Sequence, residues 1–311
     1  MVKFIHNINE SPDSELILTT GFFDGVHCGH RYLIEYMQTI AQKENLKSAI
    51  LTFWPHPRMV LHKEYQPQLL NTIEEKQERI SQLNIDYCFQ IPFTIELSNL
   101  SAYDFMKSVL LEKMHVKHLI IGYDHRFGHD RLEGFEDYYR YGQSLGITVS
   151  QAPVFSIEKK NISSSLIRRL LSYGDISQAN DFLGYPYTLT GEVVHGKEIG
   201  QTIGFPTANL SPNTPTKIIP SAGVYAVKIK YKEQIYNGMA CIGTRPTLEK
   251  DGETSIEINI FNFNKKIYGE TISVQFYEFI RPLYKFADKE ELKNSLKNDK
   301  ENVLLFFQNN P

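Results

Sequence analysis

The sequence predicts two domains of different fold class: an α/β domain with a doubly wound parallel sheet, followed by a small antiparallel β-barrel with a terminal helix. The first observation is the length of 311 residues, roughly twice that of a typical single domain. The second is a change near residue 185, where alternating strands and helices give way to strands that follow one another directly. We therefore expect domains at residues 1–184 and 185–311.

The expected first domain alternates strand-like and helix-like segments. Short apolar runs typical of buried strands occupy residues 15–20, 47–53, 86–91 and 117–122. Helix signals lie between them: apolar residues at helical spacing over 33–41, the capping-box pair Thr72 and Glu75, and a helix start at Ser101. Ligands of such sheets bind at the carboxyl ends of the strands, so the segments that follow strands are the candidate sites.

The second half contains β-branched and aromatic runs without helices between them: YTLTGEVV, GVYAVKIKY, QIYNGMACI, TSIEINIFNF and TISVQFYEFI. These runs are typical of an antiparallel barrel. A helix is predicted from Asp288 onwards, with Leu292, Leu296 and Val303 as its buried face.

Composition narrows the classes of function. The chain has 33 basic and 36 acidic side chains, a net charge of −3, which does not favour nucleic acid or an anionic membrane as a partner. No apolar stretch has the length of a signal peptide core or a membrane span, so we expect a soluble, cytoplasmic protein. The cysteines, Cys28, Cys88 and Cys241, are odd in number and scattered, which predicts free thiols.

The segment GFFDGVHCGH at 21–30 lies between the first expected strand and its helix. Its glycines allow a sharp turn, the following helix start attracts phosphate, and His27 and His30 add donors for charge on a transferring phosphorus. Two alternatives stay open: the histidines are a helix cap and a turn residue, or they form a metal site with Cys28.

Two further segments offer groups for phosphate and metal. In ISSSLIRRLL at 162–171, serines at a helix start precede Arg168, a fixed cation suited to phosphate oxygens, although serine caps and a surface arginine explain the same pattern. In PTAN at 206–209, Thr207 and Asn209 offer neutral oxygen ligands for Mg²⁺, although a proline turn with an Asn cap is the alternative. The nearby GEVVHGKE is not a phosphate loop, because Glu198 replaces the Ser or Thr that reaches magnesium.

The strand–GFFDGVHCGH–helix arrangement resembles the HxGH signature of the nucleotidyltransferase superfamily, and its FDGVHxGH form is similar to bacterial FAD synthetases. TFWPHP at 52–57, GYDHRFG at 122–128 and ISSSLIR at 162–168 are similar to further segments of that family, with departures at Trp54 and His125. The resemblance implies catalytic roles for His27, His30 and Arg168. It also implies nucleotide or phosphate binding by Gly21, Phe23, Asp24, Gly25, Gly29, Asp124, Ser163, Ser164 and Ser165.

GKEIGQTIGFPTANL at 196–210 resembles the flavokinase signature, which implies nucleotide binding by Gly196, Gly200, Gly204 and Pro206 and a metal shell with Thr207 and Asn209. SIEINIFNFNKKIYG at 255–269 is similar to the segment that carries the family's catalytic glutamate, here Glu257. FIRPLYKF at 279–286 implies that Arg281 and Phe286 contact flavin. Gln201, Asn259 and Asn262 depart from the family pattern.

Together the resemblances imply the bacterial bifunctional riboflavin kinase/FAD synthetase family. Such an enzyme phosphorylates riboflavin with ATP to FMN, then adenylylates FMN with a second ATP to FAD and releases pyrophosphate, with Mg²⁺ as the cofactor. Two rival functions are an adenylyltransferase of another substrate with a barrel that only binds it, and a non-catalytic flavin sensor. A general base such as Glu257 disfavours both rivals, because a pure binding protein does not need one.

Overall fold

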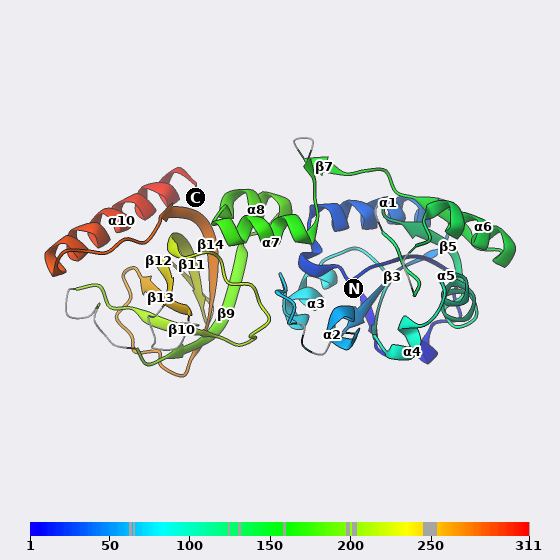
Figure 1. Cartoon of the computed structure of the whole chain (residues 1–311), viewed down its shortest axis with the longest axis horizontal. Coiled ribbons are helices and arrows are strands. Elements are labelled where there is room, and N and C mark those ends of the chain that lie inside the picture. The colour runs from blue at the N-terminus through cyan, green and yellow to red at the C-terminus, as the bar shows by residue number, and fades with distance from the viewer. Residues whose placement is uncertain are drawn as a thin grey trace. The chain divides into compact units, whose positions relative to one another are not determined.

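The computed structural model describes two compact units, Met1–Ser164 and Ser165–Pro311 (Figure 1). The residues described are 1–61, 64, 66–123, 125–129, 132–157, 160–196, 200, 204–244 and 254–310. The domain boundary expected at 184/185 stays a prediction.

The first unit is built on a six-stranded sheet with the strand order β1-β4-β3-β2-β5-β6. Every neighbouring pair in it is parallel, so the predicted doubly wound parallel sheet is confirmed. The strands are β1 (Lys3–Ile5), β2 (Leu16–Thr20), β3 (Lys47–Trp54), β4 (Tyr87–Pro92), β5 (Val116–Ile121) and β6 (Thr148–Gln151).

Helices connect these strands, and the Thr72–Glu75 capping box predicted for one of them is present with both of its hydrogen bonds. The longer helices are α1 (Cys28–Glu44), α3 (Ile73–Ser81), the π-helix η3 (Phe105–Leu111) and α6 (Phe135–Leu145). Shorter elements are η1 (Ile8–Glu10), η2 (Asp24–Val26), α2 (Pro57–Leu61), α4 (Ile95–Ser98), α5 (Ala102–Asp104) and the hairpin strands β7 (Ser156–Ile157) and β8 (Lys160–Asn161).

Both faces of the sheet are buried. Leu16 and Leu18 of β2 pack on one side against residues of η3 and α6. Ile17 packs on the other side, where α1 and α3 contribute Ile34 and Ile80. Successive strand side chains point to opposite faces, so this alternation explains why the strands read as continuous apolar runs.

The strand order creates a switch point between β2 and β5. From β2 the chain adds β3 and then β4 in one direction, whereas from β5 it adds β6 in the other, and β2 and β5 are paired. Connections leaving adjacent strands in opposite directions open a crevice at their carboxyl ends, which is where open α/β sheets bind ligands. GFFDGVHCGH follows β2 directly, and the loop that contains His125 follows β5.

The second unit contains a closed antiparallel barrel with the order β10-β13-β12-β11-β14-β9. The predicted barrel and terminal helix are confirmed. Its elements are α7 (Ser164–Tyr173), α8 (Ile176–Leu183), β9 (Tyr187–Val194), β10 (Ala208–Pro212), β11 (Gly223–Tyr231), β12 (Gln234–Thr244), β13 (Thr254–Ile260), β14 (Thr271–Arg281) and α10 (Lys289–Asn309).

The terminal helix α10 lies along the barrel (Figure 1) and packs its Val303 and Phe307 with Met239 and Phe261 of the barrel unit. Val303 is buried and Leu296 packs against this cluster, as predicted, but the buried face also includes residues that were not expected. Ser295 and Asp299 are buried with Val303 and Phe307, whereas Leu292 and Leu296 are only half-buried. The Asp299 carboxylate accepts two hydrogen bonds of 2.8 Å from Arg281 on β14, which explains how a charged residue occupies a buried position of the helix.

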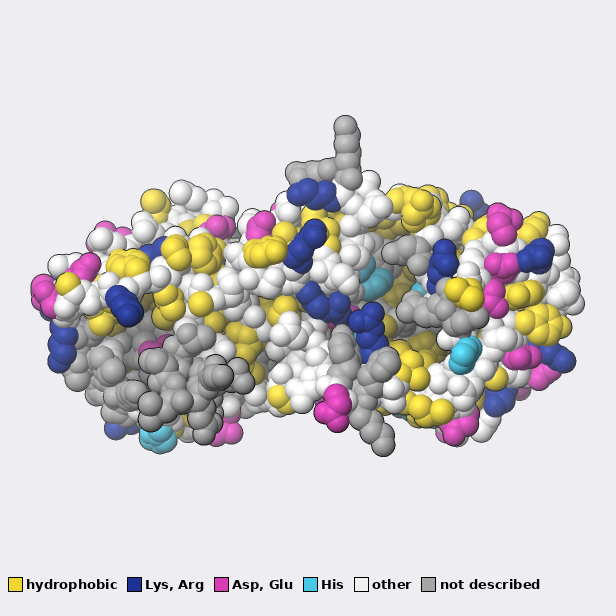
Figure 2. Space-filling model, viewed as in Figure 1, with side chains coloured by type: hydrophobic (Ala, Val, Ile, Leu, Met, Phe, Trp, Pro, Cys, Tyr) yellow, Lys and Arg dark blue, Asp and Glu magenta, His cyan; other side chains and the backbone are white. Residues whose placement is uncertain are grey.

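Charged residues of both signs are spread over the face drawn in Figure 2, in line with the nearly balanced composition. The cysteines Cys28, Cys88 and Cys241 are free thiols, as predicted. Among the helices of the described residues, none combines the length and the apolar character needed to cross a membrane.

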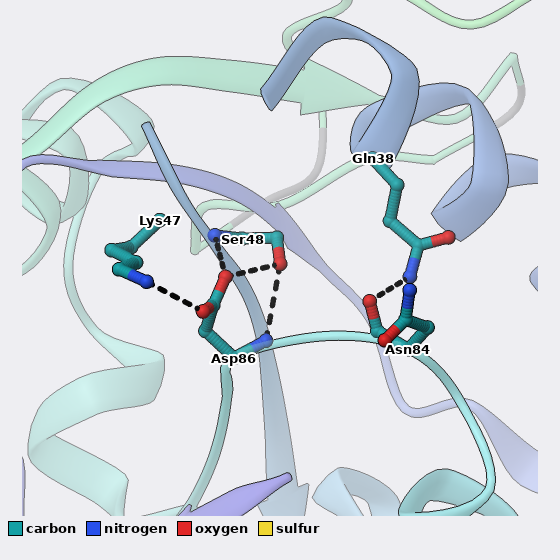
Figure 3. A network of polar contacts seen from close by, with 5 residues as sticks. All are labelled: Gln38, Lys47, Ser48, Asn84 and Asp86. Atoms are coloured by element: carbon teal, nitrogen blue, oxygen red, sulfur yellow. Dashed lines mark hydrogen bonds and ion pairs between the residues drawn. The ribbon is translucent and has the colours of Figure 1, made fainter. Parts of the chain in front are cut away.

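A polar network closes the amino-terminal edge of the sheet, at the ends of β3 and β4 away from the crevice (Figure 3). The Asp86 carboxylate accepts hydrogen bonds from the Ser48 backbone N–H (2.9 Å), the Ser48 hydroxyl (2.8 Å) and the Lys47 ammonium (3.0 Å). Partial burial by itself raises the pKa of Asp86, but the bonds from Ser48 and Lys47 outweigh it and lower the pKa below its ordinary value.

We expect Asp86→Asn to lower the free energy of unfolding by about 1–2 kcal/mol at neutral pH, because charged hydrogen bonds at a partly exposed site are lost. The lowered pKa means that the stabilisation is complete above the unfolded-state pKa of about 3.9 and is lost as pH falls through the folded-state value. Urea unfolding at neutral pH and at about pH 2.5 measures both effects. The exposed Asp13, changed to Asn, is the control; a difference between Asp86→Asn and the parental protein that is independent of pH would contradict the assignment.

The helix α8 is joined to the barrel by side-chain hydrogen bonds. The Asn180 amide donates to the Phe276 carbonyl (2.8 Å) and accepts from the Tyr187 N–H (2.7 Å). We expect a fragment 165–311 to unfold at a temperature at least about 5 °C higher than a fragment 184–311, which lacks α7 and α8. Thermal unfolding of the two fragments measures this difference, and equal midpoints would show that the helices do not stabilise the barrel.

Candidate functional sites

The turn after β2 has an unusual backbone. Phe23 (φ 54°), Gly25 (φ 81°) and Val26 (φ 37°) all lie in the left-handed region. Only glycine adopts that region without strain, and a β-branched valine is a marked exception. Side chains from elsewhere in the chain must therefore hold this conformation.

Asp24 anchors the centre of the turn. Its carboxylate is buried and accepts hydrogen bonds from the Leu70 N–H (3.0 and 3.1 Å) and the Asn71 N–H (3.3 Å), just before α3. Its backbone carbonyl accepts a bond from the Ser164 hydroxyl at 2.9 Å. These contacts support a structural role for the Asp24 side chain, whereas the predicted phosphate contact of this residue stays a prediction.

Lys76 and Thr52 anchor the start of the turn. The Phe22 carbonyl accepts one hydrogen bond from the Lys76 ammonium (3.1 Å) and one from the Thr52 hydroxyl (3.1 Å). Sequence reasoning did not select Lys76. The signal was its place between Ile73 and Ile80 on the apolar side of α3, where helical spacing expects a hydrophobic residue.

The two histidines pack together at the start of α1. His27 is the N-cap, since its Nδ1 accepts from the His30 N–H (3.3 Å), and the imidazole rings are stacked with centroids 3.6 Å apart. A Cβ at Gly29 would lie 3.2 Å from the His27 ring, so this position favours glycine. The helix-cap alternative is therefore correct for His27, and the predicted catalytic role of its ring stays a prediction. Within the described ranges no group of three His, Cys, Asp or Glu is arranged to hold a metal.

Burial and nearby positively charged groups lower the pKa of His30. Burial is the largest cause that lowers the pKa of His30 well below its ordinary value, and the positive character of His27, Lys76 and His125 lowers it further. The Nδ1 atom of His30 is enclosed without a hydrogen-bond partner in the part of the chain that is described. A site that has several cationic groups nearby and keeps an imidazole neutral is suited to binding an anion. We call Phe22–Val26, His27, His30 and Lys76 the turn site.

Other residues expected in this region are placed as follows. The Phe22 ring contacts the His56 ring, with centroids 4.4 Å apart, and so brings the TFWPHP segment to the turn. Ser163 directly precedes α7, Ser164 and Ser165 begin it, and Arg168 lies one turn later. Asp124 lies outside the described residues. The nucleotide-binding roles of Gly21, Phe23 and these serines, and the catalytic role of Arg168, stay predictions.

A second group of polar side chains lies on the barrel. Glu257 on β13 is directly opposite Asn209 on β10 and opposite Cys241 on β12. Residues opposite one another in an antiparallel sheet share a face, so the three side chains form one row across three strands. Burial is the largest cause that raises the pKa of Cys241 to about 11, and the negative charge of Glu257 adds to it. The Cys241 side chain is therefore a thiol at neutral pH.

The PTAN segment lies beside this row. The Thr207 hydroxyl donates to the Glu257 carboxylate at 3.4 Å, and the Asn259 amide donates to the Pro206 carbonyl at 2.7 Å. The departure at Asn259 thus has a structural role in holding the loop. A Cβ at Gly196 would lie 2.0 Å from the Asn209 amide nitrogen, so only glycine leaves room for that side chain. We call Thr207, Asn209 and Glu257 the barrel site.

The remaining barrel residues are arranged around the ion pair to α10. The Arg281 guanidinium uses its Nε and Nη2 on Asp299, and it lies 4.6 Å from the Tyr284 ring centroid and 5.7 Å from that of Phe286. Gly200 passes close to the Phe205 carbonyl, and Gly204 has a φ of +83°. Gln201 lies outside the described residues. The flavin contacts of Arg281 and Phe286 and the nucleotide contacts of the glycines and Pro206 stay predictions.

Comparison with known proteins finds a different family model in each half of the chain. The FAD synthetase family model matches residues 9–166, and the riboflavin kinase model matches residues 183–307. A bifunctional riboflavin kinase/FMN adenylyltransferase of Listeria monocytogenes is 38% identical over 301 residues, which cover 96% of this chain and 95% of that protein. Another from Bacillus subtilis is 34% identical over 317 residues and covers 98% and 96%.

A solved structure is similar over both units. A protein of Streptococcus pneumoniae, described as a macrolide-efflux protein, has a TM-score of 0.87 and 31% sequence identity, covering 97% of this chain and 98% of that one. The likeness supports the same fold throughout. The matched models, the sequence relatives and the two groups of side chains lead to one identification: the chain belongs to the bifunctional riboflavin kinase/FMN adenylyltransferase family.

Proposed function

We propose that this protein phosphorylates riboflavin at the barrel site and adenylylates the resulting FMN at the turn site, using one ATP in each step. The observation that carries the proposal is the pair of separate sites, each with the groups that its reaction needs. The barrel site has a carboxylate beside neutral oxygen donors. The turn site has stacked imidazoles and a buried cation at the switch point of a parallel sheet.

In the kinase step, the hydroxyl oxygen of riboflavin attacks the γ-phosphorus of ATP, and ADP leaves. Glu257 accepts the proton of that hydroxyl. The strand pairing with Asn209 places Glu257 on β13, and the hydrogen bond from Thr207 orients its carboxylate. This arrangement matches the need of phosphoryl transfer, in which positioning and electrostatics do most of the work.

The residues of the barrel site suit magnesium. The Thr207 hydroxyl, the Asn209 amide oxygen and the nearby Glu257 carboxylate form an all-oxygen donor set, which is the type that Mg²⁺ prefers. Thr207 donates its proton to Glu257, and this leaves the lone pairs of its oxygen for a cation. When bound, the ion would neutralise charge on the ATP phosphates.

In the adenylyltransferase step, the FMN phosphate attacks the α-phosphorus of ATP, the bond to the β-phosphate oxygen breaks, and pyrophosphate leaves. The nucleophile is already an anion, so the step needs alignment and charge neutralisation rather than a base. His27 and His30 supply ring donors at the amino terminus of α1, and we assign Arg168 and the serines before it to the phosphates. We also propose a cytoplasmic location, where ATP is available to both steps.

We expect His27→Asn and His30→Gln to reduce conversion of FMN to FAD by about two to three powers of ten, the usual effect of removing one preorganised donor. Asn at position 27 keeps an N-cap acceptor for α1, so the change tests the imidazole and not the cap. Chromatography of FMN and FAD in time courses measures the rate, and conversion of riboflavin to FMN on the same sample is the control. Parental FAD rates in both variants would remove the histidines from the mechanism.

We expect Glu257→Gln to reduce riboflavin phosphorylation by about two to four powers of ten, because the amide cannot accept the proton. The variant keeps the size of the side chain and an oxygen for the Thr207 hydrogen bond, so binding of flavin and nucleotide should survive. Adenylylation of supplied FMN should stay at the parental rate. An unchanged kinase rate in Glu257→Gln would exclude Glu257 as the base. If the rate of FAD formation were also normal in that variant, another carboxylate would have to be the base.

A further inference from the structure

Lys76 is a buried cation at the turn site. Its side chain projects from α3, the residue is 3% exposed, and its ammonium donates to the Phe22 carbonyl at 3.1 Å and to the Thr52 hydroxyl at 3.2 Å. Both acceptors are uncharged oxygens. Asp24 attracts the ammonium at longer range, while its own carboxylate is hydrogen-bonded to Leu70 and Asn71.

Burying this charge opposes folding. Burial is the largest cause that lowers the pKa of Lys76 to about 8, against the raising effects of Asp24 and Cys88. The side chain is therefore mostly protonated at neutral pH and destabilises the fold, because the unfolded chain holds the same proton more tightly. An apolar residue between Ile73 and Ile80 would avoid this penalty.

Support of the Phe22 carbonyl does not require a charged group at position 76. The Thr52 hydroxyl already donates to the same Phe22 carbonyl, so this buried acceptor would keep a partner without Lys76. What Lys76 adds is positive charge, and that charge reaches His30, whose pKa it helps to lower after burial and His27.

We propose that Lys76 is a positioning residue of the adenylyltransferase reaction, which fixes the Phe22 carbonyl in the strained turn and keeps a buried positive charge within electrostatic reach of His30 for the phosphates of ATP. The inference rests on the proposed function of the turn site. A fixed cation in a site shielded from water needs no reorganisation when negative charge moves from the α-phosphorus to the leaving pyrophosphate. After burial and His27, the charge of Lys76 further lowers the pKa of His30, so the imidazole takes up a proton more readily once an anion approaches.

The test compares Lys76→Met, which keeps the length and packing of the side chain, with Lys76→Arg, which keeps its charge. Lys47→Met, at the opposite edge of the sheet, is the matched control for the loss of a lysine. We expect Lys76→Met to reduce kcat for FMN to FAD by about ten- to a hundredfold, with an unchanged riboflavin kinase rate. The midpoint of thermal unfolding should be unchanged or higher, because the buried charge is gone.

The ionisation of His30 gives a readout that does not depend on activity. The titratable groups that act on it are His27, Lys76 and His125, and those that act on Lys76 are Asp24 and Cys88. In NMR titrations of the ring protons, assigned with His30→Gln, we expect the pKa of His30 to rise in Lys76→Met. It should stay at the parental value in Lys76→Arg and in Lys47→Met.

Specific outcomes would overturn the inference. A lower unfolding midpoint with loss of both activities in Lys76→Met would show that the lysine serves the fold alone. A parental FAD rate in that variant, or a His30 pKa that does not move, would show that its charge does not act on the site. If the parental protein and Lys47→Met made no FAD, the proposed function itself would fail, and that result is separate from any effect of Lys76.

Discussion

The first unit depends on the strained turn after β2. Phe23, Gly25 and Val26 keep left-handed backbone conformations only because anchors from several elements outweigh the strain. Thr52 comes from β3, Lys76 from α3, and the amide groups that bind Asp24 precede α3. The turn thus joins the sheet to its covering helices at the switch point, and it places the start of α1, with both imidazoles, directly after the carboxyl end of β2.

The barrel builds its site in a different way. Thr207, Asn209 and Glu257 do not have the left-handed backbone conformation seen in the turn. The antiparallel register of β10, β13 and β12 aligns Asn209 with Glu257. The close approach of Gly196 and the hydrogen bond from Asn259 to Pro206 then place the PTAN segment against that row. The outer helix packs Val303 and Phe307 against the barrel, and the Arg281–Asp299 ion pair adds a polar contact on the same side of α10.

Buried polar groups recur at both places, and they follow one rule. Asp24 and Asp299 are fully supplied with hydrogen bonds or an opposite charge, as buried carboxylates must be. Lys76 is the exception among them, since its bonds go to neutral oxygens and burial lowers its pKa to about 8. A buried charge without a directly bonded opposite charge lowers the stability of the fold. Such residues are often found at functional sites.

The sequence by itself determined the fold class, the Thr72–Glu75 cap and the family, because these depend on local periodicity and on short motifs whose spacing is visible along the chain. The short strands β1, β6 and β10 were not predicted. The sequence also pointed to His27, His30, Asn209 and Glu257, whose positions in a turn or a strand are local properties. The tertiary structure alone decided that Asp24 faces backbone amides, that Lys76 is buried under the turn, and that Asp299 rather than Leu292 faces the barrel. Each of these depends on a partner between 18 and 54 residues away in the chain. Local pattern carries no information about which distant atoms meet, because that is set by strand register and helix packing.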